Sequence, residues 1–435
     1  MLEPSPTERL LLLWDHLGIG IAHVAKQMPA DIAGLAATFP SRLGGVVLCV
    51  PNRLDPVPFG AVSDRVLMIC GERGLTADAI AHAEERLAGA GRIVLAGYDA
   101  PRWADVVADR TDDIAGEMAG FLDTLKATAP TAPAREGTHA GISYRVEGSG
   151  PALVLLPFFL APSQWAPAIL RLAQKFTVIT LGGRYLGGVA VLEDRAQAPP
   201  YQAMFRTLID LMAPAPGEAI LDVGCGAGSL DRLLARRLGP ANAITAIDTN
   251  RFLLHEARLL ANAEGLDALI RFSPGNAEML PFAGETFDCL FSVTVLEECD
   301  ADRALAEIVR VARPGGRVGV IVRSLDLPQW WNVAAPDSIR PKMVVPPQSV
   351  GTKGVADASL YRRAQAAGLT DLTCFPFLVT LDKPDGPIWR YREDHLLSQL
   401  TPEETTQWRA AREAADERGL LFMAHPMHCV VGRKR

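Results

Sequence analysis

The sequence predicts an α/β protein whose parallel sheets are covered by helices on both faces. Short runs rich in valine, isoleucine and leucine alternate with amphipathic stretches along nearly the whole chain, which is typical of doubly wound sheets. The chain has 435 residues, 49% of them apolar, which suffices for two or three domains of about 150 residues each. A stretch rich in proline and alanine, residues 127–138, predicts a linker between two such parts.

Candidate strands lie in all three parts of the chain. Residues 1–126 contain apolar runs at 43–50, 65–70 and 92–97. The second part, residues 139–197, has such runs at 142–148, 152–157 and 176–181, with a helix expected at 165–174. The third part, residues 198–435, opens with a helix and the strands 218–223 and 243–248.

Composition excludes several classes of protein. The chain has 43 Lys and Arg against 50 Asp and Glu, a net charge of −7, which argues against nucleic acid as a partner. No apolar stretch is long enough to span a bilayer, and the acidic start does not resemble a signal peptide. Seven cysteines are scattered without a CxxC pair, so neither a disulfide framework nor a metal site is expected. These features predict a cytoplasmic protein.

A glycine-rich loop follows the first strand of the third part. The strand ends in Asp222, glycines follow at 224, 226 and 228, and a helix is expected over 229–238. Glycines allow a tight turn and a close approach of the backbone to a ligand. A dinucleotide fingerprint would have its third glycine at 229, where this chain has serine, so the spacing disfavours a nicotinamide or flavin site.

The next strand also ends in a carboxylate. Asp248 lies 20 residues after Gly228, where it can accept hydrogen bonds from both hydroxyls of a ribose. The alternative is that Asp248 only caps the helix expected to begin near Arg251.

Two further segments carry a family resemblance. They are 275–298, which reads GNAEMLPF and then FDCLFSVTVLEE, and 304–318, which reads ALAEIVRVARPGGRV. With the glycine loop they closely resemble class I S-adenosylmethionine-dependent methyltransferases, especially the subgroup of ubiquinone and menaquinone biosynthesis. The resemblance is strong over 201–323. It is weaker beyond, where 361–375 is similar to the family's last helix and strand and 421–433 to its antiparallel final strand. It implies a Rossmann-like, seven-stranded domain over 198–435 that binds S-adenosylmethionine.

The resemblance also implies roles for particular residues. The loop would hold the methionine moiety, Asp248 the ribose, and the residues after it the adenosine. Asn276 stands where the family often has aspartate, and Ala277 would offer its backbone to the adenine. Thr294 and Val295 would form the floor under the sulfonium. The implied cofactor residues are Asp222, Gly224, Gly226, Gly228, Asp248, Thr249, Asn250, Asn276, Ala277, Thr294 and Val295.

No catalytic base is evident from the pattern. His425 and His428 are three apart on the expected final strand, so they face opposite sides and are expected to be structural. Glu297 and Glu298 follow the fourth strand of this part and are alternative candidates for a base. Residues 325–357 are rich in proline and contain the pair Trp330 and Trp331. The two tryptophans either cover a flat or apolar acceptor or pack against the sheet or another protomer.

The first two parts resemble the two halves of an α/β-hydrolase in reversed order. Residues 17–51 are similar to the region around the nucleophile, with Met28, or Gln27 in a shifted register, where the family has serine. The acid position falls at Gly74, where the family's G-E-R-D reads GERG in this chain, and the segment expected to hold the histidine, 97–103, contains none. Residues 141–157 are similar to the family's opening strands, with Pro157 and Phe158 near the position of the oxyanion hole.

This reversal predicts a circularly permuted, catalytically inactive α/β-hydrolase-like domain. Residues 1–126 would be its C-terminal half, 127–138 the linker and 139–197 its N-terminal half. We expect one continuous sheet, with 176–181 beside the strand that ends near Ala25. The alternative is two partial modules, each with an exposed edge and half a core.

These observations lead to three functional hypotheses. The first is methyl transfer to a small-molecule acceptor, with the hydrolase-like part shaping the acceptor pocket or forming a homodimer. The second is a protein that binds S-adenosylmethionine for regulation or as a scaffold, without transfer. The third, an esterase that uses Ser163, is the weakest.

Overall fold

The computed structural model describes residues 4–27, 30–51, 54–99, 106–132, 134–158, 161–183, 185–347, 350–382, 384 and 386–435. The chain forms two compact units, which divide between Ala190 and Val191. This division falls inside helix α7 (Gly187–Gln197), whereas the sequence places a boundary after residue 197. We describe each unit by itself.

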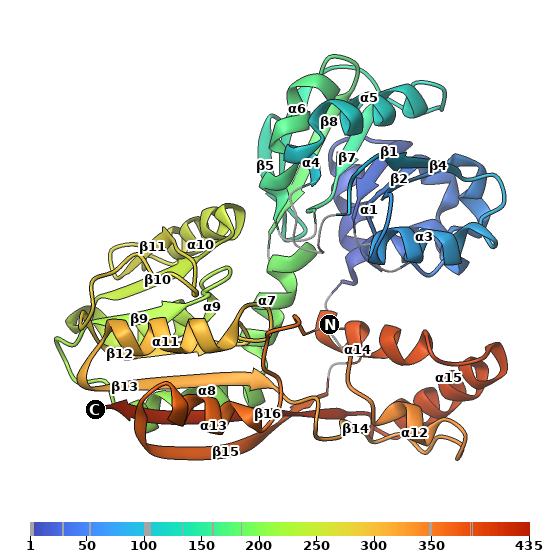
Figure 1. Ribbon diagram of the computed structural model, residues 1–435. Helices are drawn as coiled ribbons and strands as arrows, with labels where there is room; N and C mark the ends of the chain where they lie inside the picture. Colours follow the sequence, from blue (N-terminus) through green and yellow to red (C-terminus); the bar gives the residue numbers. More distant parts are fainter. Residues whose placement is uncertain are drawn as a thin grey trace. The chain divides into compact units, whose positions relative to one another are not determined.

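The N-terminal unit is built on one eight-stranded sheet in the order β4-β3-β2-β1-β7-β8-β6-β5 (Figure 1). The pairs that involve β5 or β6 are antiparallel and the others are parallel. The strands are β1 (Ala22–Lys26), β2 (Leu43–Cys49), β3 (Val66–Gly71), β4 (Gly91–Leu95), β5 (Glu136–His139), β6 (Ile142–Gly148), β7 (Ala152–Leu155) and β8 (Thr177–Gly182).

This single sheet confirms the prediction that the first two parts of the chain fold together. The predicted neighbour of β1 is wrong, however: β1 pairs with β7, through His23 and Leu153, and β8 lies on the far side of β7. β7 is short and buried at every position, which suits an inner strand. The end of the expected linker, residues 136–138, belongs to edge strand β5.

Helices cover both faces of this sheet. One face packs against α1 (Pro6–His16), α2 (Ala30–Thr38) and α3 (Leu75–Glu84), and the other against α4 (Val106–Asp109), α5 (Thr111–Leu122) and α6 (Ala166–Leu172). Alternate residues of each inner strand enter the two cores, with Val46 in one and Val47 in the other, as the twofold period of a strand requires.

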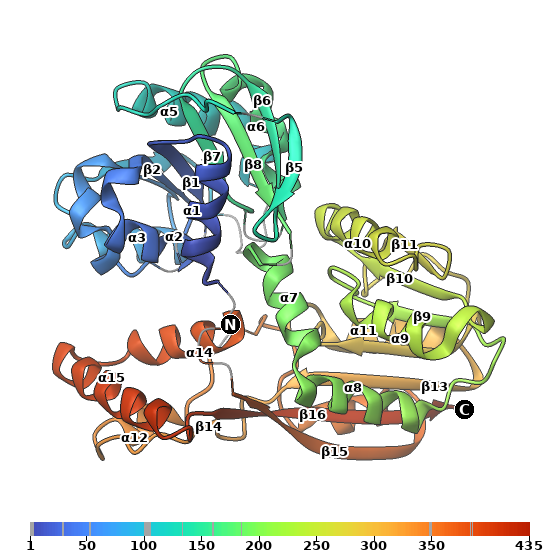
Figure 2. The ribbon, with the colours of Figure 1, turned by 180° about the vertical axis from the view of Figure 1, so that it is seen from behind.

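The C-terminal unit contains a mixed sheet in the order β11-β10-β9-β12-β13-β16-β14, with β15 also paired to β16 (Figure 2). The final strand β16 is antiparallel to β13, as predicted. The sequence predicts seven strands, and the structure adds an eighth, the two-residue strand β14, which pairs with the start of β16. The strands are β9 (Ile220–Val223), β10 (Ile244–Asp248), β11 (Ile270–Pro274), β12 (Phe287–Val293), β13 (Ala312–Arg323), β14 (Trp330–Trp331), β15 (Leu369–Leu381) and β16 (Met423–Lys434).

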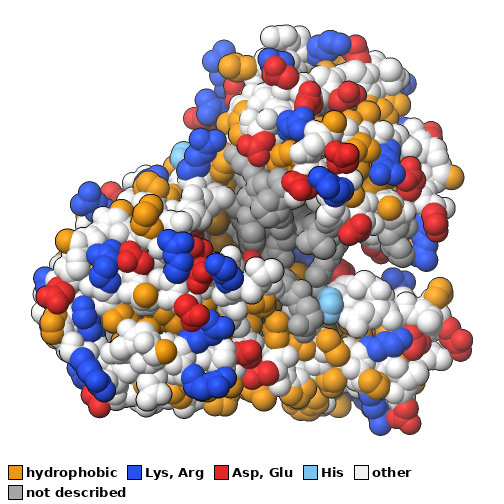
Figure 3. Space-filling model, viewed as in Figure 1, with side chains coloured by type: hydrophobic (Ala, Val, Ile, Leu, Met, Phe, Trp, Pro, Cys, Tyr) orange, Lys and Arg blue, Asp and Glu red, His pale blue; other side chains and the backbone are white. Residues whose placement is uncertain are grey.

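Helices cover this sheet as well. α8 (Pro199–Met212), α9 (Ser229–Leu238) and α10 (Arg251–Ala263) pack on one face, where α14 (Pro387–Leu397) and α15 (Pro402–Glu417) extend the core. α11 (Ala301–Val311) and α13 (Ser359–Ala366) pack on the other. α12 (Arg340–Met343) is a single turn. Among the described residues, no helix has the length and apolar character needed to cross a membrane. On the face shown in Figure 3, acidic and basic side chains are interspersed.

Candidate active site

The glycine loop connects β9 to α9 at the carboxyl end of the sheet's parallel strands. Gly224, Gly226 and Gly228 all have positive φ values, of 87°, 56° and 69°, which favour glycine. The amide of Gly224 donates to the carbonyl of Ile247 on neighbouring β10 at 2.8 Å. A Cβ built on Gly224 would lie 2.2 Å from Cγ2 of Val295. Residue 224 must therefore be glycine for the loop to close against the end of β12.

Asp248, the last residue of β10, supports this loop. Its Oδ2 accepts a hydrogen bond from the Gly226 amide at 2.9 Å, and its Oδ1 accepts one from the Asn250 amide at 2.8 Å. The helix α10 is capped by Asn250, whose side chain accepts from Phe252 and Leu253 at 3.0 Å each. The capping role considered for Asp248 thus belongs to Asn250. Burial raises the pKa of Asp248, although the loop amides act against this rise.

Two further carboxyl groups lie buried beside the loop. Asp222 is 3% exposed, and Asp231, on the first turn of α9, is fully buried. Burial raises the pKa of Asp222 well above its ordinary value, and the carboxylates of Asp231 and Asp248 raise it further. Burial raises the pKa of Asp231 to about 7, against a hydrogen bond from Asp222 that lowers it. Burial and mutual repulsion thus favour the protonated form of this carboxyl pair. The sequence analysis missed Asp231, although an acidic residue in the turn after a glycine loop is a visible signal.

The last turns of α7 pack against the loop and its helix. Glu193 accepts hydrogen bonds at 2.5 Å from the Ser229 hydroxyl and from the Arg232 guanidinium, and all three residues are buried. Leu192 lies 3.1 Å from a Cβ built on Gly226. The sequence analysis placed no functional residue on this helix, because its contacts with the loop are long-range.

The predicted adenine residues follow β11. The Gly275 amide donates to the Asp248 carbonyl at 3.1 Å, which places this loop beside the end of β10. Asn276 and Thr249 are exposed, and Ala277 is buried. The Asn276 side chain accepts from the Glu278 amide at 2.9 Å.

Thr294 follows β12 in an unusual conformation. Its φ is 59°, which is rare and costly for a β-branched residue. Its amide donates to the Ile321 carbonyl at 2.8 Å, and its hydroxyl accepts from Arg195 Nη1 at 2.9 Å. The structure thus brings Thr294 and Val295 to the glycine loop, and it adds Arg195, which the sequence analysis did not identify.

The two histidines of β16 face opposite sides of the sheet, as predicted. His425 is 1% exposed, and its Nε2 lies 2.9 Å from the Tyr201 hydroxyl on α8. His428 contacts the Tyr361 hydroxyl at 2.8 Å and Asp326 at 2.7 Å on the other side. Burial, together with the charge of Arg392, lowers the pKa of His425 well below its ordinary value, so its imidazole is neutral.

The two glutamates proposed as bases are engaged by Arg323 at the end of β13. Oε1 of the buried Glu297 accepts from the Arg323 amide at 2.7 Å, and Glu298 pairs with the Arg323 guanidinium at 3.1 Å. Burial raises the pKa of Glu297, and the charge of Arg323 counteracts this rise. These contacts indicate a structural role for both glutamates, which hold the Arg323 side chain in place.

The tryptophan pair divides between core and surface. The Trp331 ring lies 5.0 Å from Trp389 and 5.3 Å from Trp408, and its Nε1 donates to the Met343 carbonyl at 3.1 Å. Trp330 is 51% exposed and contacts Phe422 edge to face. Packing within the unit, the second alternative for these residues, therefore accounts for Trp331.

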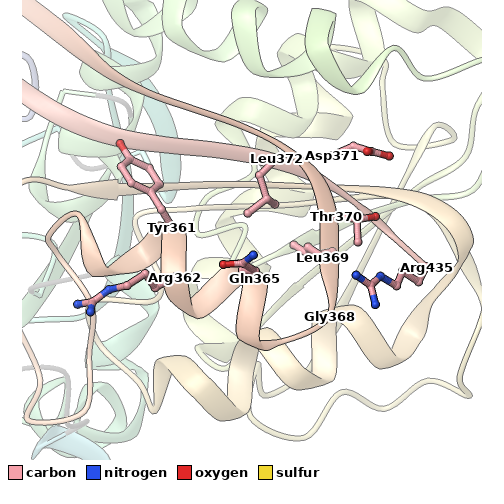
Figure 4. Close-up of a pocket in the computed structure, with 9 residues that line it drawn as sticks. All are labelled: Tyr361, Arg362, Gln365, Gly368, Leu369, Thr370, Asp371, Leu372 and Arg435. Atoms are coloured by element: carbon pink, nitrogen blue, oxygen red, sulfur yellow. The ribbon is translucent and has the colours of Figure 1, made fainter.

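A cavity of about 530 Å³ lies at the other edge of the sheet (Figure 4). It is formed where β15 begins and β16 ends, beside α13. β16 ends opposite the start of β13, so this is the amino end of the parallel strands, away from the glycine loop. The cavity is lined by Tyr361, Arg362, Gln365, Gly368, Leu369, Thr370, Asp371, Leu372 and Arg435.

The corresponding edge of the N-terminal unit carries different groups. After β1, Gln27 is buried and its amide donates to the Val50 carbonyl at 3.1 Å. Phe158, after β7, is buried edge to face against Trp165. Met28 and residues 100–103 lie outside the described residues. Glu72, in the segment expected to hold the acid, accepts from the Gly97 amide at 2.7 Å.

Comparison with known proteins identifies part of the chain. The family profile described as "Methyltransferase domain" matches residues 221–320. A ubiquinone/menaquinone biosynthesis C-methyltransferase, UbiE of Legionella pneumophila, is 37% identical over 117 residues, which cover 27% of this chain and 47% of the relative. Methyltransferase GfsG of Streptomyces halstedii is 32% identical over 120 residues, 27% of this chain and 42% of the relative. The chain thus spans about half the length of the curated relatives that it matches.

Solved structures also resemble the chain. The [4+2]-cyclase SpnF has a TM-score of 0.37 and 23% identity, covering 54% of this chain and 80% of its own. Geranyl diphosphate methyltransferase in complex with SAM has a TM-score of 0.34 and 18% identity, covering 54% of this chain and 86% of its own.

Proposed function

We propose that residues 221–320, which match the methyltransferase profile, are a class I S-adenosylmethionine-dependent methyltransferase domain and that the chain transfers a methyl group from S-adenosylmethionine to a small-molecule acceptor. The observation that carries the proposal is the closed glycine loop, with Asp248 accepting from the Gly226 amide at 2.9 Å. This contact holds the loop against β10 and leaves further lone pairs of the same carboxylate for a ribose.

The residues at this edge fit such a cofactor. S-adenosylmethionine carries a sulfonium and an ammonium group, and the carboxyl groups of Asp222, Asp231 and Asp248 suit a cationic ligand. Both Asp231 oxygens are buried, and apart from the neighbouring Asp222 carboxyl group no described residue donates to them. We assign the methionine moiety to the loop Asp222–Gly228 and the ribose to Asp248. The adenosine is assigned to Thr249, Asn250, Asn276 and Ala277.

The chain's own residues serve mainly to orient and enclose the reactants. The cofactor supplies an activated methyl group, and alignment of the acceptor with that methyl contributes several kcal/mol to catalysis. Thr294 is held in its strained conformation from two sides, by the Ile321 carbonyl and by Arg195. We propose that it forms the floor of the transfer site together with Val295. A base is needed only if the acceptor retains its proton.

Radiolabelled transfer tests the proposal. The full chain is incubated with methyl-labelled S-adenosylmethionine and a small-molecule extract of cells, with Asp248→Ala as the matched variant. We expect label in one organic product with the unaltered chain and little with the variant. Calorimetric binding of the cofactor without any labelled product would instead favour the regulatory hypothesis. Absence of binding would contradict both hypotheses.

We also propose that the N-terminal unit is a circularly permuted α/β-hydrolase-like domain without hydrolase activity. The connection from β4 to β5 joins the two opposite edges of its sheet, although consecutive strands are usually neighbours. Counted from β5 through β8 and then from β1 through β4, the strand order becomes 1-2-4-3-5-6-7-8. In this numbering, strands that follow each other in the sequence are either neighbours in the sheet or separated by a single strand, which supports a permuted chain.

This unit is proposed to contribute structurally, by shaping the acceptor pocket or by forming a homodimer. A cytoplasmic location is proposed from the seven free cysteines, since disulfides are rare in reducing compartments. The interspersed surface charges in Figure 3 support a small molecule rather than nucleic acid as the acceptor.

A further inference from the structure

Three arginines of the C-terminal unit act on the same buried pair of side chains, and one of them, Arg195, contacts Thr294. Arg195 comes from α7, Arg323 from the end of β13 and Arg392 from α14. Their positive charges all act on the phenol of Tyr201, whose pKa burial raises and the three arginines lower. The same three charges act on the neighbouring His425. The Arg195 guanidinium lies 5.9 Å from the centre of the Tyr201 ring, and the Tyr201 hydroxyl lies 2.9 Å from Nε2 of His425. We call the three arginines around this pair the cluster.

Among the described residues, two of these arginines have neutral hydrogen-bond partners only. Arg195 donates to the Thr294 hydroxyl at 2.9 Å, and Arg392 donates to the side-chain Oε1 of Gln329 at 2.9 Å. Within the described part of the chain, neither forms an ion pair with a carboxylate. Only Arg323 has such partners, in Glu297 and Glu298.

The burial of the cluster makes this arrangement costly. Arg392 is 6% exposed and its Nε lacks a hydrogen-bond partner. Nδ1 of His425, which is 1% exposed, also lacks one. Buried guanidinium groups are stable only when a counter-charge and hydrogen-bond acceptors compensate their lost hydration. Arg392 is such a group, and Arg195, which is partly exposed, is influenced only by the Glu297 carboxylate that already pairs with Arg323. This shortage of negative charge around Arg392 and Arg195 indicates that a ligand supplies it.

We propose that Arg195, Arg323 and Arg392 bind an anionic group of the methyl acceptor, a carboxylate or a phosphate. The inference rests on the proposed methyl transfer and names its substrate class. Arginine suits both groups because its planar donors match pairs of oxygens. Arg195 also contacts Thr294, so the anion lies next to the floor assigned to the transfer site. The acceptor is then held by its charge at one end and presents its reacting atom toward the loop.

The Tyr201–His425 pair has a positioning role in this arrangement. In the tautomer whose Nε2 accepts the phenol hydrogen, the neutral imidazole carries Nδ1–H, a donor without a hydrogen-bond partner among the described residues. It therefore offers the anion a further hydrogen bond without adding a fourth positive charge.

Ligand binding to the full chain tests the proposal directly. The probes are inorganic pyrophosphate and 4-hydroxybenzoate, with uncharged 4-hydroxybenzyl alcohol for comparison, each measured by calorimetry with and without S-adenosylhomocysteine. We expect at least one anion to bind and the alcohol not to bind. Arg392→Gln and Arg195→Gln should each weaken anion binding at least tenfold. Arg237→Gln, which removes a surface arginine paired with Asp210, should leave it unchanged.

The variants also report on folding. Because Arg392→Gln removes a buried cation without a carboxylate partner, its melting temperature should equal or exceed that of the unaltered chain. A large fall in melting temperature, unchanged anion affinity in both variants, or no anion binding at all would overturn the proposal. Binding of pyrophosphate alone or of hydroxybenzoate alone supports it and selects phosphate or carboxylate.

The labelled product of the extract assay gives an independent result. We expect it to be retained by an anion-exchange resin at neutral pH, whereas a product that is not retained would overturn the anionic acceptor. Failure of transfer altogether would contradict the proposed function, and the anion-binding measurement would still decide the assignment of the arginine cluster.

Discussion

In both units, a central parallel strand ends between two neighbouring strands, but the side chains at that end differ. In the C-terminal unit, β9 lies between β10 and β12, and its end carries Asp222 and a glycine turn. In the N-terminal unit, β1 lies between β2 and β7, and its end carries the buried Lys26 and Gln27. Both edges are positions where doubly wound sheets bind ligands. The same architecture therefore offers a site in both units.

The difference lies in which polar groups each edge carries, since both units bury some that lack a hydrogen-bond partner among the described residues, such as the Ser163 hydroxyl and Nε of Arg392. Gln27 donates to the Val50 carbonyl, and Phe158 packs edge to face on Trp165, so both serve the core of their unit. In the C-terminal unit, the carboxyl groups of Asp222 and Asp231 form a buried pair, and Nε of Arg392 is buried without a hydrogen-bond partner among the described residues. Such groups lower stability unless a ligand compensates them. Function thus depends on the side chains placed on the fold and cannot be read from the fold alone.

The largest effect is expected from two glycines that differ in their surroundings. Gly224 and Gly74 each follow a strand of a parallel sheet, with φ values of 87° and 85°. A Cβ at residue 224 would lie 2.2 Å from Val295, whereas one at residue 74 would have no neighbour within 4 Å among the residues that the structure describes. Backbone strain alone costs about 1–3 kcal/mol. We expect Gly74→Ala to lose about that much stability, and Gly224→Ala about 3 kcal/mol or more, because overpacking adds to the strain.

Denaturant unfolding of the two variants measures this difference. Calorimetry should also show loss of S-adenosylmethionine binding for Gly224→Ala alone. Equal destabilisation of both variants would mean that Val295 moves aside, and the close packing of the loop would then not explain the glycine.

The second effect concerns two carboxylates that each support a glycine amide. Asp248 accepts from Gly226 at 2.9 Å, and Glu72 in the N-terminal unit accepts from Gly97 at 2.7 Å. Asp248→Ala should weaken S-adenosylmethionine binding by about 1–3 kcal/mol, because the ribose hydroxyls lose their acceptor. Glu72→Ala should leave that affinity unchanged. The ribose assignment would be refuted by a titration in which both variants bind like the unaltered chain.

Local patterns in the sequence identified much of this site, and long-range packing supplied the rest. Alternating strands and helices predicted both sheets, and the glycine spacing predicted the loop with Asp222 and Asp248, since these signals lie within short segments. The order of parallel strands is decided by packing between distant segments, so the position of β7 between β1 and β8 was missed. Arg195 meets Thr294 across 99 residues, and no local signal marks that contact.

The third effect is a pH dependence of opposite sign in the two units. Burial raises the pKa of Asp231 from 3.8 to about 7, so the folded chain keeps a proton that the unfolded chain loses in this range. Stability of the C-terminal unit should therefore fall as pH rises from about 4 to 7. Burial lowers the pKa of His23 from 6.5 to about 4, and between these values the unfolded chain binds the extra proton. Stability of the N-terminal unit should therefore fall as pH drops from 6.5 to 4.

Hydrogen exchange of peptides from each unit, followed across pH 4–8, measures the two slopes separately. Asp231→Asn should flatten the slope of the C-terminal unit, and His23→Gln that of the N-terminal unit. Slopes of the same sign in both units would contradict this assignment.

The smallest effect is expected for ester hydrolysis by the N-terminal unit. An esterase needs a nucleophile, a base and an oxyanion hole with preorganised donors. Gln27 is committed to the Val50 carbonyl, and the buried His23 is neutral and lies edge to face against Phe176. Ser163 has a buried hydroxyl without a hydrogen-bond partner, so no base activates it. We therefore expect no turnover of p-nitrophenyl esters above background, either by the unaltered chain or by Met28→Ser, and no change in Ser163→Ala. Turnover that Ser163→Ala abolishes would show that this edge retains a catalytic site, and the contrast between the two units would then fail.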